Sequence, residues 1–229
     1  MTGRPDASVH PASERTVAFV DLAGFTALTD AHGDSAAVDL IDAFTGAARE
    51  AVAGIDAELV KSIGDAVMIA AADPGAGLRS VQRLFESTRE LNGFPEPRAG
   101  LHHGSVIERG GDYYGATVNL AARVASRAGS SQTFATATMV DAAGEAGIAA
   151  TSLGVQVLRN IARPVELWSL ELCPGDVHVS VDPVCRMRVA AGAVAGRIRH
   201  GGVEHRFCSL ACVAAFVAEP DRYVDGAPS

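Results

Sequence analysis

The 229-residue sequence lacks any apolar run long enough to cross a bilayer. A membrane-spanning helix needs about 20 consecutive apolar residues, whereas apolar runs here, such as AVMIAAA at 66–72, stop at seven. The first 15 residues contain no apolar segment, so we expect no secretory signal and a flexible tail over residues 1–15. These absences predict a cytoplasmic protein without a membrane partner.

Clusters of positive charge are also missing. Lys and Arg number 19 against 27 Asp and Glu, which gives a formal net charge of -8. Binding to a nucleic acid requires a basic face that neutralises phosphates, so we expect no nucleic-acid partner. An acidic protein still binds a nucleoside triphosphate when metal ions carry the positive charge. That class of ligand therefore stays open.

Cysteine is scarce, with four residues in the whole chain. In the reducing compartment expected here, so few cysteines argue against a disulfide framework. Three of them, Cys185, Cys208 and Cys212, fall in the last 45 residues. This asymmetry predicts a second, smaller module at 181–227, separated by a linker at 174–180 from a first domain at 16–173.

Hydrophobic periodicity predicts the fold of the first domain. The expected elements are a buried strand at 16–20 ending at Asp21, a helix beginning at Asp34 or Ser35, two strands flanking Gly64–Asp65, a helix at 77–93 and a strand at 97–108. This β-α-β-β-α-β order is that of a ferredoxin-like α+β domain, in which two helices cover one face of an antiparallel sheet. Extra C-terminal helices and strands follow it.

Two aspartates stand at the ends of neighbouring strands in this arrangement. Asp21 ends the first strand, and Asp65 lies at the tip of the hairpin formed by residues 59–71. Because the first strand lies beside that hairpin, the two carboxylates converge, as two Mg²⁺ ions bound to a triphosphate require. The alternative is that Asp65 is only a turn residue and Lys61 only a solvated charge.

Two further features fit a bound nucleotide. Asn119 and Arg123 are spaced i, i+4 on a short helix and so share one face, although a solvated surface Arg is the simpler alternative. A turn that leads into a helix offers backbone N–H groups to phosphate oxygens. That turn follows Asp21 and consists of Ala23, Gly24, Phe25 and Thr26.

Three segments resemble the signature blocks of the class III adenylate and guanylate cyclase catalytic domains: FVDLAGFT, KSIGDAVM and GDYYGATVNLAARV. The resemblance runs from about Thr16 to Leu172. It implies that Asp21 and Asp65 bind two Mg²⁺ or Mn²⁺ ions per active site. It also implies a head-to-tail homodimer whose two active sites lie across the interface, because each site takes its metal ligands from one subunit and its remaining residues from the other.

The remaining family positions imply roles for four more residues. Lys61 and Asp112 would select adenine, whose N1 accepts and whose N6 donates a hydrogen bond. Asn119 would orient the ribose, and Arg123 would stabilise the charge on the α-phosphate. The implied reaction converts ATP to 3′,5′-cyclic AMP and pyrophosphate. A guanylate cyclase and a catalytically silent dimeric signalling module are the alternatives.

The segments DPVCRM at 182–187 and EHRFCSLACVAAFVAEPDRYV at 204–224 resemble the YHS domain, a small TRASH-like treble-clef module. That resemblance implies a metal site at Cys185, Cys208 and Cys212. Three thiolates leave tetrahedral Zn²⁺ one ligand short, whereas soft Cu⁺ accepts three sulfurs. The candidates for a fourth ligand are Asp182, His200 and His205. The alternative is three buried thiols that pack as small hydrophobic groups.

Overall fold

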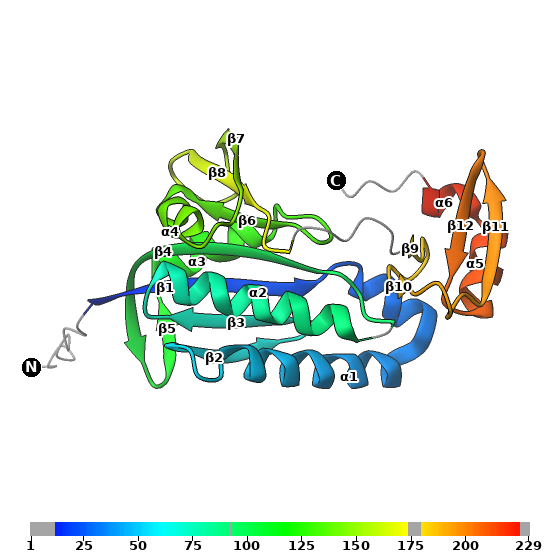
Figure 1. Ribbon diagram of the computed structural model, residues 1–229, viewed down its shortest axis with the longest axis horizontal. Coiled ribbons are helices and arrows are strands. Elements are labelled where there is room, and N and C mark those ends of the chain that lie inside the picture. Colours follow the sequence, from blue (N-terminus) through cyan, green and yellow to red (C-terminus); the bar gives the residue numbers. More distant parts are fainter. Residues whose placement is uncertain (1–11, 92, 174–179, 225–229) are drawn as a thin grey trace, which may run out of the picture.

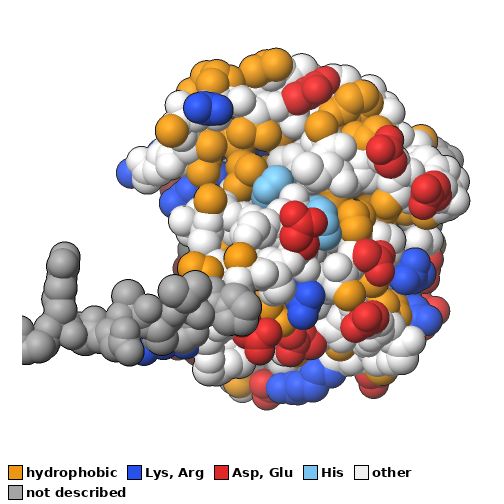
Figure 2. All heavy atoms as spheres, turned by 90° about the vertical axis from the view of Figure 1, so that its left-hand side faces the viewer, with side chains coloured by type: hydrophobic (Ala, Val, Ile, Leu, Met, Phe, Trp, Pro, Cys, Tyr) orange, Lys and Arg blue, Asp and Glu red, His pale blue; other side chains and the backbone are white. Residues whose placement is uncertain are grey.

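The computed structural model describes residues 12–91, 93–173 and 180–224. They form a large α+β domain and a small C-terminal module, which lies at the end of the sheet where the first helix begins (Figure 1). On the face shown in Figure 2, acidic and basic side chains are interspersed with apolar ones. Within the described ranges, no helix is both long and apolar enough to cross a membrane.

The large domain is built on one eight-stranded sheet in the order β2-β3-β1-β4-β6-β8-β7, with β5 paired to β4. The order of the first four strands is the ferredoxin-like one, so the predicted α+β fold is confirmed for this domain. The strands are β1 (Ala12–Leu22), β2 (Ala57–Ile63), β3 (Ala66–Ala71), β4 (Pro97–Arg109), β5 (Asp112–Tyr114), β6 (Thr133–Thr136), β7 (Ala150–Gln156) and β8 (Val165–Leu170).

Helices cover both faces of this sheet, because side chains of each strand alternate between the faces. Val20 and Ile69 point into the core beneath α1 and α2, whereas Val17 and Met68 point to the side of α3. The helices of the domain are α1 (Phe25–Val52), α2 (Pro74–Glu90), α3 (Ala116–Ala125), the short 3₁₀ helix η1 (Ala137–Met139) and α4 (Val140–Glu145).

Helix α1 begins earlier than the sequence predicts. It starts at Phe25, and the predicted start at Asp34 instead follows a break at Gly33, whose φ of 82° and ψ of 167° are not helical. The segment before the break is apolar on the side that faces the C-terminal module, where Leu28 is fully buried. The hydrophobic periodicity of a helix face packed on the sheet therefore did not reveal this first segment of α1.

The C-terminal module consists of two hairpins and two helices. Its elements are β9 (Ser180–Val181), β10 (Arg188–Val189), β11 (Gly196–His200), β12 (Val203–Phe207), α5 (Leu210–Ala218) and α6 (Pro220–Val224). Phe207 and Phe216 are buried in one cluster with Leu28 and Ala37 of α1. The module therefore shares its hydrophobic core with the large domain.

Two predicted segments lie at the edges of the described residues. Strand β1 begins at Ala12, because its pairing with β4 continues as far as Ile107, so the predicted tail over 1–15 is wrong for residues 12–15. Residues 1–11 and most of the predicted linker at 174–180 lie outside the described residues.

Candidate functional site

The two aspartates expected to bind metal lie on neighbouring strands. Asp21 pairs across β1 and β3 with Ala66, the residue that follows Asp65 in the hairpin turn. Burial raises the pKa of Asp65, and the negative charge of Asp21 contributes to the rise. The structure thus places the two carboxylates within electrostatic reach of each other, whereas their role as metal ligands stays a prediction.

Arg98 is the residue of this site that sequence reasoning missed. It faces Asp21 across β1 and β4, where its Nε donates to Oδ1 at 2.5 Å and its Nη2 donates to Oδ2 at 3.0 Å. The hydrogen bond to Asp21 raises the pKa of Arg98. The pairing of the predicted strands could have revealed Arg98, because in an antiparallel pair the start of the fourth strand lies beside the end of the first.

The turn after β1 differs in one detail from the expected phosphate cradle. The N–H group of Ala23 donates to the carbonyl of Glu96 at 3.0 Å, so this group is already engaged. Gly24 caps α1 in the left-handed conformation, with a φ of 79°. The N–H groups of Gly24, Phe25 and Thr26 therefore remain as the candidate phosphate donors.

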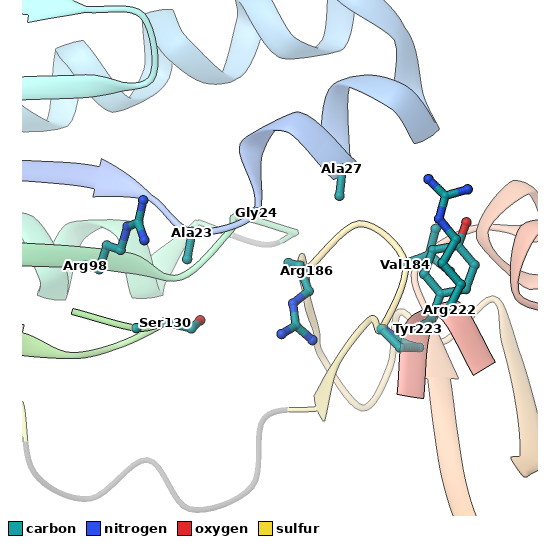
Figure 3. A pocket seen from close by; sticks show the side chains of 11 residues that line it. Ala23, Gly24, Ala27, Arg98, Ser130, Val184, Arg186, Arg222 and Tyr223 are labelled. Atoms are coloured by element: carbon teal, nitrogen blue, oxygen red, sulfur yellow. The ribbon is translucent and has the colours of Figure 1, made fainter. Parts of the chain in front are cut away.

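A cavity of about 450 Å³ adjoins this turn and is lined by both the turn and the C-terminal module. Ala23, Gly24 and Arg98 line it on one side, and Arg186 and Tyr223 line it on the module side. In Figure 3 the side chain of Arg186 extends from the module into the space beside Gly24. The cavity therefore carries basic side chains from both parts of the chain.

Lys61 and Asp112 form the pair that the family resemblance implied. Lys61 Nζ donates to both carboxylate oxygens of Asp112, at 2.8 and 2.6 Å, and this contact lowers the pKa of the carboxyl group. The N–H group of Tyr113 also donates to Asp112, at 2.8 Å. The pair therefore presents a cationic donor and an anionic acceptor side by side on β2 and β5.

Asn119 and Arg123 lie on the exposed side of α3. This helix is anchored to β4 at its start, where Thr117 Oγ1 donates to the carbonyl of Ser105 at 2.7 Å. In the described part of the chain, no hydrogen bond or ion pair joins Asn119 or Arg123 to the other candidate residues. Within one protomer the candidate residues thus form two separate groups, Asp21 with Asp65 and Lys61 with Asp112. Asn119 and Arg123 lie apart from both, on the exposed face of α3.

The three C-terminal cysteines come together, but their neighbour is not one of the expected ligands. The imidazole of His32 lies with Cys185, Cys208 and Cys212 in a group whose ligand atoms are all within 4.8 Å of one another. None of the expected candidates belongs to this group. Those candidates were Asp182, which accepts backbone N–H groups, His200, which pairs with Asp221, and His205, which packs on Phe216.

Known sequences match the large domain. The family model of the adenylate and guanylate cyclase catalytic domain matches residues 8–170. The pH-sensitive adenylate cyclase of Mycobacterium tuberculosis (strain CDC 1551 / Oshkosh) is 35% identical over 161 residues, which are 69% of this chain and 40% of that protein. An adenylate cyclase of Streptomyces griseus is 40% identical over 110 residues, or 48% of this chain and 28% of that protein. The chain thus spans less than half the length of these relatives.

Solved structures match the same fold. An adenylate cyclase of Trypanosoma brucei in its monomeric state superposes with a TM-score of 0.63 at 27% identity, covering 76% of this chain and 96% of that chain. The adenylyl cyclase CyaB from P. aeruginosa gives a TM-score of 0.61 at 20% identity, covering 73% and 98%. At the latter identity the likeness shows the fold alone.

Proposed function

Because the chain belongs to the family of adenylate and guanylate cyclase catalytic domains, we propose that it is an adenylate cyclase that converts ATP to 3′,5′-cyclic AMP and pyrophosphate. The observation that carries the choice of substrate is the contact between Lys61 and Asp112. The ammonium group has three donors and the carboxylate has several lone pairs, so each keeps capacity for adenine N1 and N6. Guanine presents the reverse pattern at these positions.

The carboxylates of Asp21 and Asp65 fit a pair of divalent cations. Their charges are close enough for Asp21 to raise the pKa of Asp65, and oxygen ligands of this kind suit Mg²⁺ and Mn²⁺. Bound there, such ions would lower the pKa of the ribose 3′-hydroxyl and neutralise the β- and γ-phosphates. Arg98 holds the carboxylate of Asp21 in place with two hydrogen bonds.

Asn119 and Arg123 act on a nucleotide held by a second subunit in this proposal. Both side chains point outward from α3, so a partner protomer is needed to bring them to the carboxylate pair. There Arg123 would donate hydrogen bonds to the charge that develops on the α-phosphate, while Asn119 orients the ribose. A head-to-tail homodimer then contains two equivalent active sites.

The first experiment is product formation from ATP and from GTP with Mg²⁺ or Mn²⁺, using the full chain. We expect cyclic AMP and pyrophosphate from ATP. Cyclic GMP as the main product would make the protein a guanylate cyclase instead. An ordered dimer that forms neither product would refute the enzymatic proposal and leave a silent signalling module.

A mixing experiment tests the shared site separately. Asp65→Ala is expected to be inactive because it removes a proposed metal ligand. Arg123→Ala is expected to lose about 10²–10³ in rate because it removes a transition-state donor. Mixed, the two variants should regain activity, since each heterodimer contains one intact site. Arg127→Ala, which removes an exposed arginine four residues beyond Arg123, is the matched control and should stay active. Demonstrated heterodimers without activity would exclude the shared-site arrangement.

A further inference from the structure

Four metal-ligating side chains meet where the C-terminal module contacts the large domain. Cys185 lies in the loop between β9 and β10, Cys208 follows β12, and Cys212 lies in the first turn of α5. The fourth side chain, His32, comes from α1 of the large domain, at the residue before the break at Gly33. The group thus joins segments that are 176 and 180 residues apart in the sequence.

The spacing of the ligand atoms matches a tetrahedral metal site. Bonds of about 2.3 Å to sulfur and about 2.0 Å to nitrogen place two sulfurs about 3.8 Å apart and a sulfur and a nitrogen about 3.5 Å apart. Cys208 Sγ lies 3.4 Å from Cys185 Sγ and 3.8 Å from Cys212 Sγ. His32 Nε2 lies 3.6 Å from Cys208 Sγ and 3.7 Å from Cys212 Sγ. Three of these four edges lie within about 0.2 Å of the tetrahedral values, and the edge between Cys185 and Cys208 is about 0.4 Å shorter.

A tetrahedral metal site accounts for this group better than a disulfide or simple packing of thiols does. A disulfide has a sulfur–sulfur distance of about 2.05 Å, well below the 3.4 Å between Cys185 and Cys208. Thiols that only fill space need no imidazole among them, and Cys185 and Cys212 are fully buried here. Three thiols with one imidazole nitrogen directed at two of their sulfurs instead form the donor set of a closed Cys₃His site.

A buried carboxylate fixes the loops that carry the cysteines. Asp182 is fully buried and accepts hydrogen bonds from the N–H groups of Val184 at 2.8 Å, Cys185 at 3.4 Å and Cys208 at 2.8 Å. Ser209 Oγ accepts a hydrogen bond from the N–H group of Cys212 at 3.1 Å. Such contacts hold ligands in position before a metal arrives, as outer-shell groups do in metal sites.

We propose that His32, Cys185, Cys208 and Cys212 bind one zinc ion, and that this ion fastens the C-terminal module to helix α1. Three thiolates and one imidazole in tetrahedral positions favour Zn²⁺ over oxygen-seeking cations. The site lacks an open position for a substrate, so its role is structural or regulatory. Because Gly24 caps the start of α1, zinc links the module to the helix whose first turn is the candidate phosphate site.

Metal content and retention in the reduced full chain test the ligand set. We expect one equivalent of zinc, and tetrahedral thiolate spectra when Co²⁺ replaces it. His32→Ala should lose zinc to a chelator at a concentration about 10- to 100-fold lower than the wild type, since even outer-shell losses weaken binding that much. His32→Cys should restore retention, because four thiolates also form a closed site.

The matched control is His200→Ala, which removes an imidazole of the module that pairs with Asp221 and lies outside the group. Its zinc retention should equal that of the wild type. Reduced wild-type protein that binds neither zinc nor Co²⁺ would overturn the proposal. Equal retention by His32→Ala and His200→Ala would also overturn it.

Hydrogen exchange tests whether the ion joins the two parts. Removal of zinc should accelerate amide exchange in residues 25–33 of α1 and in residues 181–224, while α2 stays unchanged. Acceleration confined to the module would show that the ion does not fasten it to α1, and the proposal would fail. Neither measurement depends on nucleotide turnover, so the outcome is separate from that of the proposed function.

Discussion

Gly100→Ala is the sharpest test of how α3 is positioned. A Cβ atom at Gly100 would lie 2.0 Å from the backbone nitrogen of Ala125, 2.4 Å from its Cα and 2.7 Å from the carbonyl carbon of Val124. These are backbone atoms, so no side-chain rotation relieves the contact. Since ordinary contact begins at 3.4 Å, the end of α3 has to move by about 1.4 Å or β4 has to distort.

Two consequences follow for the variant, one for stability and one for turnover. Overpacking of this kind costs about 1–3 kcal/mol, which for a chain of this size lowers the melting temperature by about 2–12 °C. Arg123 lies two residues before Ala125 on the same helix, so the displacement also moves its guanidinium. A misplacement of about 1 Å costs on the order of 10² in rate. Thermal unfolding and kcat for cyclic AMP formation measure the two effects.

The control is Gly46→Ala, within α1, where an added Cβ meets nothing within 4 Å. Alanine should raise stability there by about 0.5–1 kcal/mol through its better helix propensity and leave turnover unchanged. A Gly100→Ala variant with the wild-type melting temperature would contradict the close packing of α3 on β4. A destabilised variant with wild-type kcat would contradict the role of Arg123.

Three other predictions concern single polar groups. Asp112→Ala should lower kcat/KM for ATP more than tenfold without a gain for GTP. It should barely change the melting temperature, because a half-exposed ion pair with Lys61 contributes about 0–1 kcal/mol. Equal kcat/KM in variant and wild type would refute the role of Asp112 with adenine. Asp182→Asn should cost about 1–3 kcal/mol in denaturant unfolding, because asparagine keeps one accepting oxygen and replaces the other with an NH₂ donor, so either the N–H group of Cys208 or those of Val184 and Cys185 lose their acceptor. Unchanged unfolding would contradict this contact. Burial lowers the pKa of His102 to about 4, below the unfolded value of about 6.5. The unfolded state therefore binds more protons between these values, and stability should fall by about 2–3 kcal/mol as the pH drops from 6.5 to 4. His102→Asn should show a smaller fall in the same unfolding series, and an equal fall would assign it to other groups.

Periodicity predicts the parts of the fold whose apolar side chains face the sheet. The first four strands and the two long helices follow from that alternation, and the hairpin at Gly64–Asp65 follows from its turn residues. The first segment of α1 does not follow, because Leu28 packs against the module rather than the sheet. A local pattern cannot reveal a contact with a segment more than 150 residues away.

The same limit applies to the candidate sites. The family resemblance singles out Lys61 and Asp112, which the structure joins across 51 residues. Residue type and spacing miss Arg98, whose partner is fixed only by strand register. They also miss His32, because nothing near this residue marks it as a ligand. Its partners become its neighbours only when the module folds against α1.

The contact between Arg186 and Gly24 connects the proposed zinc site to the turn that is the candidate phosphate site. Arg186 has a φ of 62°, a left-handed conformation that costs a non-glycine residue about 1 kcal/mol or more and persists only where the surroundings enforce it. A Cβ at Gly24 would come within 2.5 Å of Arg186 Cγ, so only glycine allows this approach. Arg186 directly follows Cys185, one of the four ligands. If zinc binds as proposed, the ion and the turn are therefore separated by a single residue, and loss of zinc from Cys185 releases the arginine that lies against the start of α1.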